Sequence, residues 1–354
     1  MKQFLTEWRK YLAEEKNNSI KEIKAESVYD AGVSIGEALG KQTVEAAKLA
    51  KVDKLIKQFP DWMKEGKKLS KQITPNAYDL ALGVGKGAGL TEEQVFALWY
   101  EELVYADQKD KSKLKDTGCT DVVIKSGDNV IIGHTNDFTP GDNSRLFKIQ
   151  IKDKPTLYMV FTMGCPSIGL NSHGMVFSGN QIDANDTRSG IPRMMLYMEG
   201  VFSKNIEQAK KLFFHKDRAS SFNNIVADEK GFIKTLEASA TAKKEINHKE
   251  DSIEAHSNHF VWLKDKEGRE DKSYTDSVKR LERAYEDAEK KGHDMNVDDM
   301  KEILSSHGEG GLCRHSKDKS GTATIFSVIF LPKERKFYYG HGYPCKTEYF
   351  EVKY

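Results

Sequence analysis

Cys119 is the residue of this sequence whose surroundings offer the clearest route to covalent chemistry. It lies in the run DTGCTDVVI, directly after Gly118. Because glycine has no Cβ, the peptide between Gly118 and Cys119 can be held in a strained geometry with its carbonyl open to attack. The thiol can then attack that carbonyl, take the acyl group from nitrogen to sulfur, and let water cleave the thioester. The alternative interpretation is a buried strand cysteine without chemistry.

Such a cleavage would leave Cys119 with a free α-amino group, whose reference pKa is about 7.7–8.0. An amine with this pKa can serve as a general base near neutral pH. Nucleophile and base would then belong to one residue, as in enzymes with an N-terminal threonine nucleophile. The other way to activate the thiol is a pairing with one of the ten histidines of the chain. The sequence alone does not separate these two routes.

Two further polar residues are candidates for a site around the thiol. Asp137 lies in the run GHTNDF at the end of an expected strand, and Asn258 lies between His256 and His259 in EAHSNHFVW. A neutral amide beside a buried nucleophile is a good oxyanion donor, because it gives a hydrogen bond without changing the local charge. Asp and Asn are also common turn residues, so each has a structural alternative.

The remaining cysteines near the C-terminus form two short pairs with histidines. Cys313 and His315 are separated by one residue, and His341 and Cys345 by three. Two cysteines and two histidines can close a tetrahedral zinc site. The spacings differ from the usual ligand spacings, and the pairs flank an expected hairpin. Zinc therefore competes with a purely structural role.

The first third of the chain is rich in Ala, Leu, Lys and Glu, and it predicts helices. Apolar residues at helical spacing favour one amphipathic helix over 34–59. A second helix is expected over 89–106, with Thr91 as its N-cap. The glycine-rich run GVGKGAG at 83–89 lacks the sequence of a phosphate loop and predicts a helix–helix junction in which small residues let helices approach closely.

From Cys119 onward, short β-branched and aromatic runs separated by turn residues predict mainly strands. The expected strands include 119–126, 129–138, 146–152, 156–163, 174–182, 321–332 and 336–344. A strand pair is expected within 222–239, and helices are expected over 191–214, 275–291 and 297–307. This order predicts an α+β fold in which sheets are sandwiched by helices. The lysine-rich stretch 109–118 is expected to be an exposed linker between the two parts.

Composition excludes several classes of protein. The 354 residues contain 55 Lys and Arg against 54 Asp and Glu, so the formal net charge is +1. A nucleic-acid or membrane-surface binder would need a positive excess. The first residues carry charges throughout and no apolar signal segment, and no stretch is long and apolar enough to span a membrane. Four cysteines are too few for a disulfide scaffold. We expect a cytoplasmic enzyme that acts on small molecules and binds neither nucleic acid nor membrane.

Taken together, these motifs resemble the acyl-coenzyme A:6-aminopenicillanic acid acyltransferase family, also called isopenicillin N acyltransferase-like, of the N-terminal-nucleophile hydrolases. The runs GCTDVVI and IIGHTNDF resemble the start of the family's catalytic part, and AHSNHF resembles its H-T-N-H motif. The segments 168–182, 189–203 and 303–345 are similar to later blocks, and 29–48 and 83–103 are similar to the pro-region. One departure is Asn136, where the family often has an aromatic or acidic residue.

The resemblance implies a four-layer αββα sandwich with a helical N-terminal segment. Cleavage between Gly118 and Cys119 would divide the single domain into a helical pro-segment, 1–118, and a catalytic chain, 119–354. Cys119 would be the nucleophile, its α-amine the base, Asp137 an orienting group and Asn258 an oxyanion donor. Asn180, in SGNQI, would lie near the substrate. The C-terminal cysteines and histidines would then be structural, with no metal and no cofactor.

The implied activity is cleavage or transfer of an acyl group from a small-molecule amide or acyl thioester through a Cys119 thioester. The two cleaved chains would remain together as a heterodimer, and a homo-oligomer is compatible with this. Two alternatives stay open. One is an uncleaved thiol hydrolase with a Cys–His dyad, and the other is a non-catalytic binding protein on the same scaffold.

Overall fold

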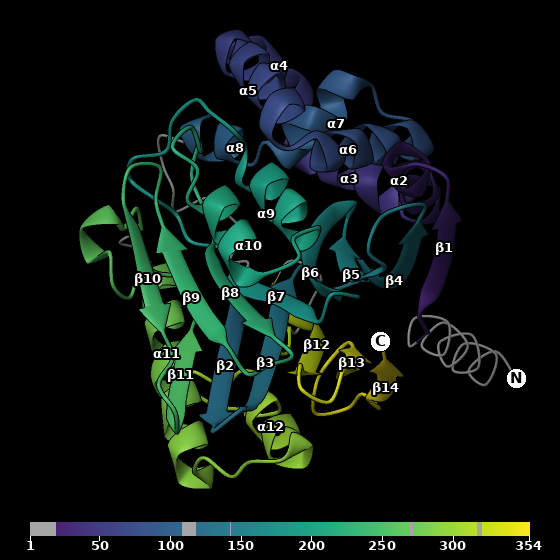
Figure 1. Ribbon diagram of the computed structural model, residues 1–354. Helices are drawn as coiled ribbons and strands as arrows, with labels where there is room; N and C mark the ends of the chain where they lie inside the picture. Colours follow the sequence, from purple (N-terminus) through teal and green to yellow (C-terminus); the bar gives the residue numbers. More distant parts are fainter. Residues whose placement is uncertain (1–18, 108–117, 142, 270–271, 317–320) are drawn as a thin grey trace, which may run out of the picture.

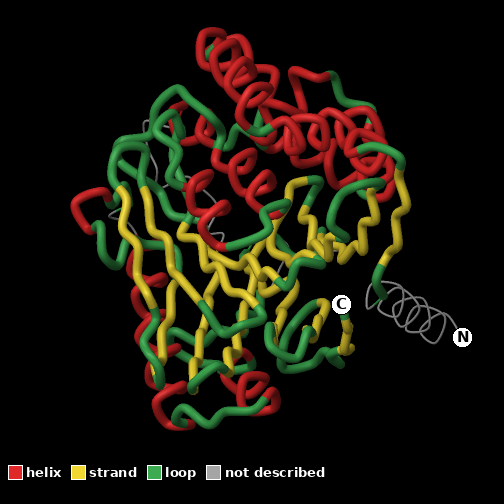
Figure 2. Tube along the Cα trace, viewed as in Figure 1, coloured by secondary structure: helices red, strands yellow, loops and turns green. Residues whose placement is uncertain are grey.

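The computed structural model describes residues 19–107, 118–141, 143–269, 272–316 and 321–354. Within these ranges two β-sheets lie face to face between layers of helices (Figures 1 and 2). This arrangement is the αββα sandwich that the resemblance implies. Of the linker expected over 109–118, residues 109–117 lie outside the described residues, and Gly118 is the first residue of a strand.

The first sheet has eight strands in the order β1-β4-β5-β6-β7-β8-β9-β10. Strand β1 runs parallel to β4, and the other neighbours are antiparallel. The strands are β1 (Lys21–Ala25), β4 (Ser144–Ile151), β5 (Leu157–Thr162), β6 (Cys165–Asn171), β7 (Met175–Asn180), β8 (Asn223–Asp228), β9 (Ile233–Ala238) and β10 (Lys243–Asn247).

The second sheet has six antiparallel strands in the order β11-β2-β3-β12-β13-β14. The strands are β2 (Gly118–Ser126), β3 (Asn129–Phe138), β11 (Ser252–His256), β12 (Ala323–Leu331), β13 (Lys336–His341) and β14 (Phe350–Lys353). Side chains alternate across it: Val123 faces the first sheet, whereas Val122 and Ile124 face the opposite way, toward α11 (Lys272–Lys291) and α12 (Val297–Leu304). The six-stranded sheet is therefore buried on both faces.

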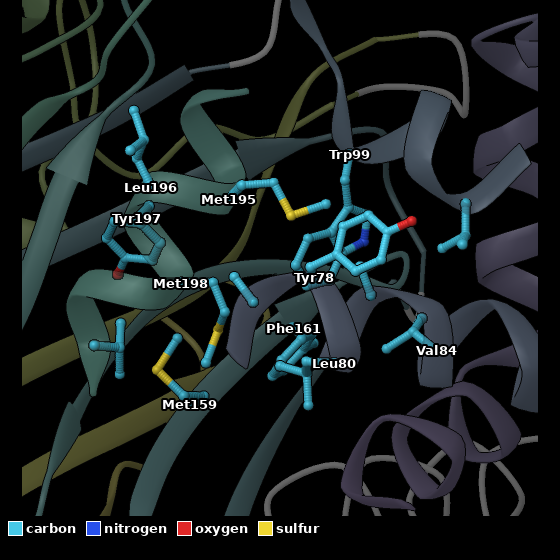
Figure 3. Close-up of a cluster of buried hydrophobic side chains, with 14 of the residues drawn as sticks. Tyr78, Leu80, Val84, Trp99, Met159, Phe161, Met195, Leu196, Tyr197 and Met198 are labelled. Carbon is cyan, nitrogen blue, oxygen red and sulfur yellow. The ribbon is translucent and has the colours of Figure 1, made fainter. Parts of the chain in front are cut away.

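The outer side of the eight-stranded sheet carries the N-terminal helices of the described residues together with two later ones. These are α2 (Val28–Ala38), α3 (Gly40–Leu49), α4 (Val52–Gln58), α5 (Pro60–Ile73), α6 (Pro75–Ala88), α7 (Glu92–Trp99), α8 (Glu102–Asp107), α9 (Arg193–Val201) and α10 (Ile206–Phe213). Figure 3 shows the core beneath them, in which Trp99, Met195 and Leu80 gather with Phe161 of β5. The N-terminal segment thus shares one hydrophobic core with the rest of the chain.

Several local predictions need correction. The single helix expected over 34–59 is three helices, which break at Leu39 and at Lys51, where φ is +54°. The helix expected over 89–106 also breaks, at Tyr100, although its predicted N-cap Thr91 closes a capping box with Gln94. The N-terminal part is expected to be helical throughout, but residues 21–25 form strand β1. Pairing with β4 stabilises this strand.

The glycine-rich run is not a junction but the second half of α6, which ends at Gly89 with φ +77°. Its small residues do allow a close crossing with α2, as expected. A Cβ built on Gly83 would lie 2.1 Å from the carbonyl oxygen of Tyr29, and one built on Gly36 would lie 2.2 Å from that of Val84. Contacts this short exclude any side chain, so the sequence of this run serves helix packing.

Candidate active site

The predicted nucleophile and the predicted aspartate meet at one end of the six-stranded sheet. Antiparallel pairing of β2 with β3 sets Gly118 opposite Asp137 and Cys119 opposite Asn136. At the start of β12, Thr324 pairs with Asp137, and its hydroxyl donates a 2.7 Å hydrogen bond to Asp137 Oδ1. The register of three strands therefore delivers residues 118, 137 and 324 to one place.

The space around Gly118 leaves little room for a side chain. Gly118 lies in the strand pairing of β2, opposite Asp137. A Cβ at residue 118 would lie 3.0 Å from Nη2 of Arg280 and 3.2 Å from Oδ2 of Asp137. These polar groups close in on the residue before the expected cut, and a side chain would displace them.

The Cys119 thiol is half-buried and faces a cavity. Asn136 Nδ2 lies 3.6 Å from the sulfur, and the backbone N–H of Cys119 donates to Oδ1 of Asn258 over 2.8 Å. Burial, followed by the charges of Asp121 and Asp137, raises the pKa of the Cys119 thiol to about 12. The thiol is therefore protonated at neutral pH and needs a base to become a nucleophile.

Arg280, on α11, is the main residue of this site that sequence reasoning missed. Its buried guanidinium donates to the Cys119 carbonyl at 2.8 Å, to Thr120 Oγ1 at 2.7 Å and to Asn258 Oδ1 at 2.8 Å. Its Nε also donates to Asp276 one helical turn earlier, at 3.1 Å. The helix carries many charges at i,i+4 spacing, so nothing in the sequence distinguished this arginine from its solvent-facing neighbours.

Asn258 is held in place by the loop after β11. Its backbone N–H donates to Ser277 Oγ at 2.7 Å, and its Nδ2 donates to the carbonyl of Gln181 at 2.9 Å. Glu237 fixes the same loop by accepting bonds from His256 and from backbone N–H groups of residues 261–263. Both polar ends of the Asn258 amide are thus engaged, the oxygen by the Cys119 nitrogen and by Arg280.

His259, three residues after the end of β11, should make the free energy of unfolding depend on pH. Burial, with His256 and Arg280 adding to it, lowers its pKa to about 4. The unfolded chain then binds a proton near pH 6.5 and the folded chain does not, so stability falls as pH drops from about 6.5 toward 4. We expect this residue to cost about 1–2 kcal/mol of unfolding free energy at about pH 5 relative to about pH 7.

Urea unfolding of His259→Gln and wild type at the two pH values measures this contribution. The variant should lose less stability on acidification, by about 1–2 kcal/mol. The exposed His293 provides a control, and His293→Gln should follow the wild type. Equal pH dependence of all three proteins would contradict the assignment.

The cavity at Cys119 has a volume of about 310 Å³, within the range of small-molecule sites. Its walls are mainly apolar and come from both parts of the chain: Leu49, Leu98 and Val104 precede residue 118, and Met163 and Phe222 follow it. Among the described residues that line it, none is a histidine. This disfavours a Cys–His dyad.

Asn180, the predicted substrate-binding residue, lines the same cavity as Cys119. It ends β7, opposite Asn223 of β8, whose Nδ2 donates to Asn180 Oδ1 at 3.0 Å. The buried Nδ2 of Asn180 has no hydrogen-bond partner in the described part of the chain. A buried donor without a partner is costly, and a ligand oxygen bound in the cavity that Asn180 lines would supply one.

Two stacked sheets between helical layers, with a Gly–Cys step at the start of a central strand, define the fold class of the N-terminal-nucleophile hydrolases. The family model described as acyl-coenzyme A:6-aminopenicillanic acid acyl-transferase matches residues 124–345. The chain belongs to this family of acyl-transferases.

A curated relative is similar to part of the chain. The Beta-alanyl-dopamine/carcinine hydrolase of Drosophila melanogaster is 27% identical over 145 residues, which are 36% of this chain and 38% of the relative. The chain thus matches well under half of that protein's length.

Two solved structures are similar as well. Penicillin V acylase from Agrobacterium tumefaciens has a TM-score of 0.46 at 9% identity, over 66% of this chain and 86% of that one. A variant of conjugated bile acid hydrolase from Clostridium perfringens has a TM-score of 0.43 at 9% identity, over 67% of this chain and 97% of that one.

No helix among the described residues has the length and apolar character required to cross a membrane.

Proposed function

We propose that the protein is a cysteine amidohydrolase or acyltransferase that activates itself by cleaving the bond between Gly118 and Cys119. The observation that carries the proposal is the 2.8 Å hydrogen bond from the Cys119 nitrogen to Asn258, at the wall of an apolar cavity. This nitrogen becomes the α-amine after cleavage, and a side chain already holds it beside the thiol.

In the proposed reaction the α-amine of Cys119 takes the proton of the thiol, which burial and carboxylates keep protonated otherwise. The sulfur attacks the substrate's amide carbonyl, a C–S bond forms and the C–N bond breaks. The amine product leaves with the proton from the α-ammonium group. Water then releases the acid from the thioester, or a second amine accepts the acyl group, according to how well the cavity excludes water.

We assign stabilisation of the oxyanion, which forms on the substrate's carbonyl oxygen, to the side-chain amides of Asn180 and Asn258. Within the described part of the chain, Asn180 Nδ2 has no hydrogen-bond acceptor and can donate to the oxyanion directly. Asn258 Nδ2 must first give up its hydrogen bond to the carbonyl of Gln181. Asp137, buried and bonded to Thr324, orients the end of the strand next to Gly118. An amide donor stabilises the developing negative charge without adding a charge of its own.

The cavity walls suggest both the substrate class and the fate of the cut chain. Because apolar side chains on both sides of residue 118 form the walls, the segment before the cut would remain bound as the partner of the catalytic chain. The acyl group would be apolar and small enough for about 310 Å³. A suitable probe is penicillin V, which the name of a similar protein suggests and whose acyl group is small and largely apolar. β-Alanyl-dopamine and carcinine, with a charged acyl group, and conjugated bile acids, with a larger one, should be poorer substrates.

Intact-mass measurement of the purified protein tests the self-cleavage. We expect two fragments, residues 1–118 and 119–354, with Cys119 at a free amino terminus, that co-elute in native gel filtration. Cys119→Ala should remain one chain, because no thiol is present to accept the acyl group. A wild-type protein that stays uncleaved yet hydrolyses amides would support the unprocessed thiol hydrolase instead, and one that is uncleaved and inactive would support a binding protein.

A further inference from the structure

A second group of reactive side chains lies near the C-terminal end of the chain, outside the Cys119 cavity. Four potential metal ligands, His307, Cys313, His315 and Cys345, each offer one ligand atom, and these atoms all lie within 4.8 Å of one another. None of the four lines the Cys119 cavity. They come from the two loops that flank β12 and β13, and 29 positions separate Cys345 from the nearest of the others along the sequence.

We propose that these four residues bind one zinc ion in a tetrahedral, structural site. Zn²⁺ prefers cysteine sulfur and histidine nitrogen, and four protein ligands leave no open position for a substrate. Binding would release the two thiol protons and involve no oxidation, so that two thiolates balance the charge of the ion. The proposal goes beyond the acyl-transfer function and does not depend on it.

The spacing of the ligand atoms supports this ion. Zn–S bonds of about 2.3 Å and Zn–N bonds of about 2.0–2.1 Å place tetrahedral ligand atoms about 3.3–3.8 Å apart. His315 Nε2 lies 3.5 Å from the sulfur of Cys313 and 3.2 Å from that of Cys345. These separations need changes of only tenths of an ångström to become edges of the tetrahedron.

The surroundings orient the two imidazoles. The His315 ring stacks on Tyr343 with centroids 4.1 Å apart and meets the His307 ring edge-on at 5.1 Å. His307 Nδ1 also lies 3.1 Å from the carbonyl oxygen of Cys313. Cys313 is buried, whereas the other three ligands are exposed. The site is therefore built at the surface, where an ion can enter from solvent.

The structure corrects the choice of ligands that the sequence suggested. Cys313, His315 and Cys345 are in the cluster, but His341 is replaced by His307, which follows α12. His341 ends β13, and its Nδ1 is 3.4 Å from the hydroxyl of Tyr339. The three ligands that follow α12 have the spacing H-x₅-C-x-H, and only the fold of the loop shows that they come together.

The position of this site suggests what the ion does. Arg314 lies between two of the ligands, and its guanidinium is 3.2 Å from Asp276 and 3.7 Å from Asp137 of the Cys119 site. An ion that ties this loop to the loop after β13 would limit the movement of Arg314. It would thereby support the buried charge of Asp137.

Metal analysis of the untagged, full-length protein, purified without chelators from zinc-supplemented medium, tests the proposal. We expect about one zinc per chain in the wild type. His307→Ala and Cys345→Ser should lose most of it. His341→Ala and Cys165→Ser remove the same side-chain types outside the cluster, and both should keep it. Cys119→Ala should also keep it, so the result is independent of whether the protein is an active enzyme.

Two further measurements exclude a trivial loss through misfolding. Cobalt added to the chelator-treated wild type should give a thiolate-to-cobalt charge-transfer band that Cys313→Ser lacks. A chelator should lower the Tm of the wild type and leave that of Cys345→Ser unchanged. A wild type that holds no zinc and takes up no cobalt, equal losses in the His307 and His341 variants, or a Cys313–Cys345 disulfide in its intact mass would each overturn the site.

Discussion

Replacing Cys119 with alanine should lower kcat/KM for amide cleavage by at least about 10³-fold, the effect of removing a covalent nucleophile. The loss has two physical sources in the proposed mechanism. The sulfur that forms the thioester is gone, and the uncleaved chain has no α-amine at residue 119 to serve as base. Steady-state rates on the amide that the wild type hydrolyses fastest provide the measurement.

A second thiol in the same cavity gives the matched control. Cys165, at the start of β6, also lines the cavity and is half-buried, and burial raises its pKa even further. Cys165→Ala should therefore keep most of the activity and all of the self-cleavage. If both alanine variants lose activity equally, the thiols serve packing of the cavity, and the assignment of Cys119 as nucleophile is wrong.

Replacing Arg280 with lysine should lower kcat by about 10²-fold or more, the cost of a small displacement of reacting groups. Lysine keeps the charge but lacks the planar fork, which here reaches the Cys119 carbonyl, Thr120 and Asn258 at 2.7–2.8 Å. Because Arg280 does not line the cavity, KM should change little. The split between kcat and KM is what distinguishes positioning of the nucleophile from a loss of substrate binding.

Arg283, on the same helix, is the control for general damage to α11. It pairs with Asp287 four residues later at 2.6 Å and is partly exposed. Arg283→Lys should leave kcat near the wild-type value, and a far-ultraviolet spectrum should show that both variants are folded. Equal losses of kcat in the two variants would remove Arg280 from the site.

Much of this protein follows from local sequence alone. Short β-branched and aromatic runs between turn residues predicted β2, β3, β4, β5 and β7, because such side chains fit a pleated, partly buried surface. Local sequence also predicted α11 and α12, whose side chains have helical spacing. It predicted the Thr91 cap, because an N-cap depends on hydrogen bonds between near neighbours. Strands with weak patterns of their own, such as β1 and β14, were not predicted, because pairing with a neighbour stabilises them.

The sequence by itself also singled out Cys119 as the candidate nucleophile, since a Gly–Cys step before a strand is a local feature, and this assignment stays a prediction. Only the tertiary structure decided what surrounds that residue. Asp137 arrives through strand register, Arg280 through the packing of α11, and the cavity walls through a core shared across residue 118. The proposed zinc site shows the same division: its cysteines were candidate ligands in the sequence, but His307 takes the place of His341 because the fold of a loop, and not a spacing rule, sets the distances.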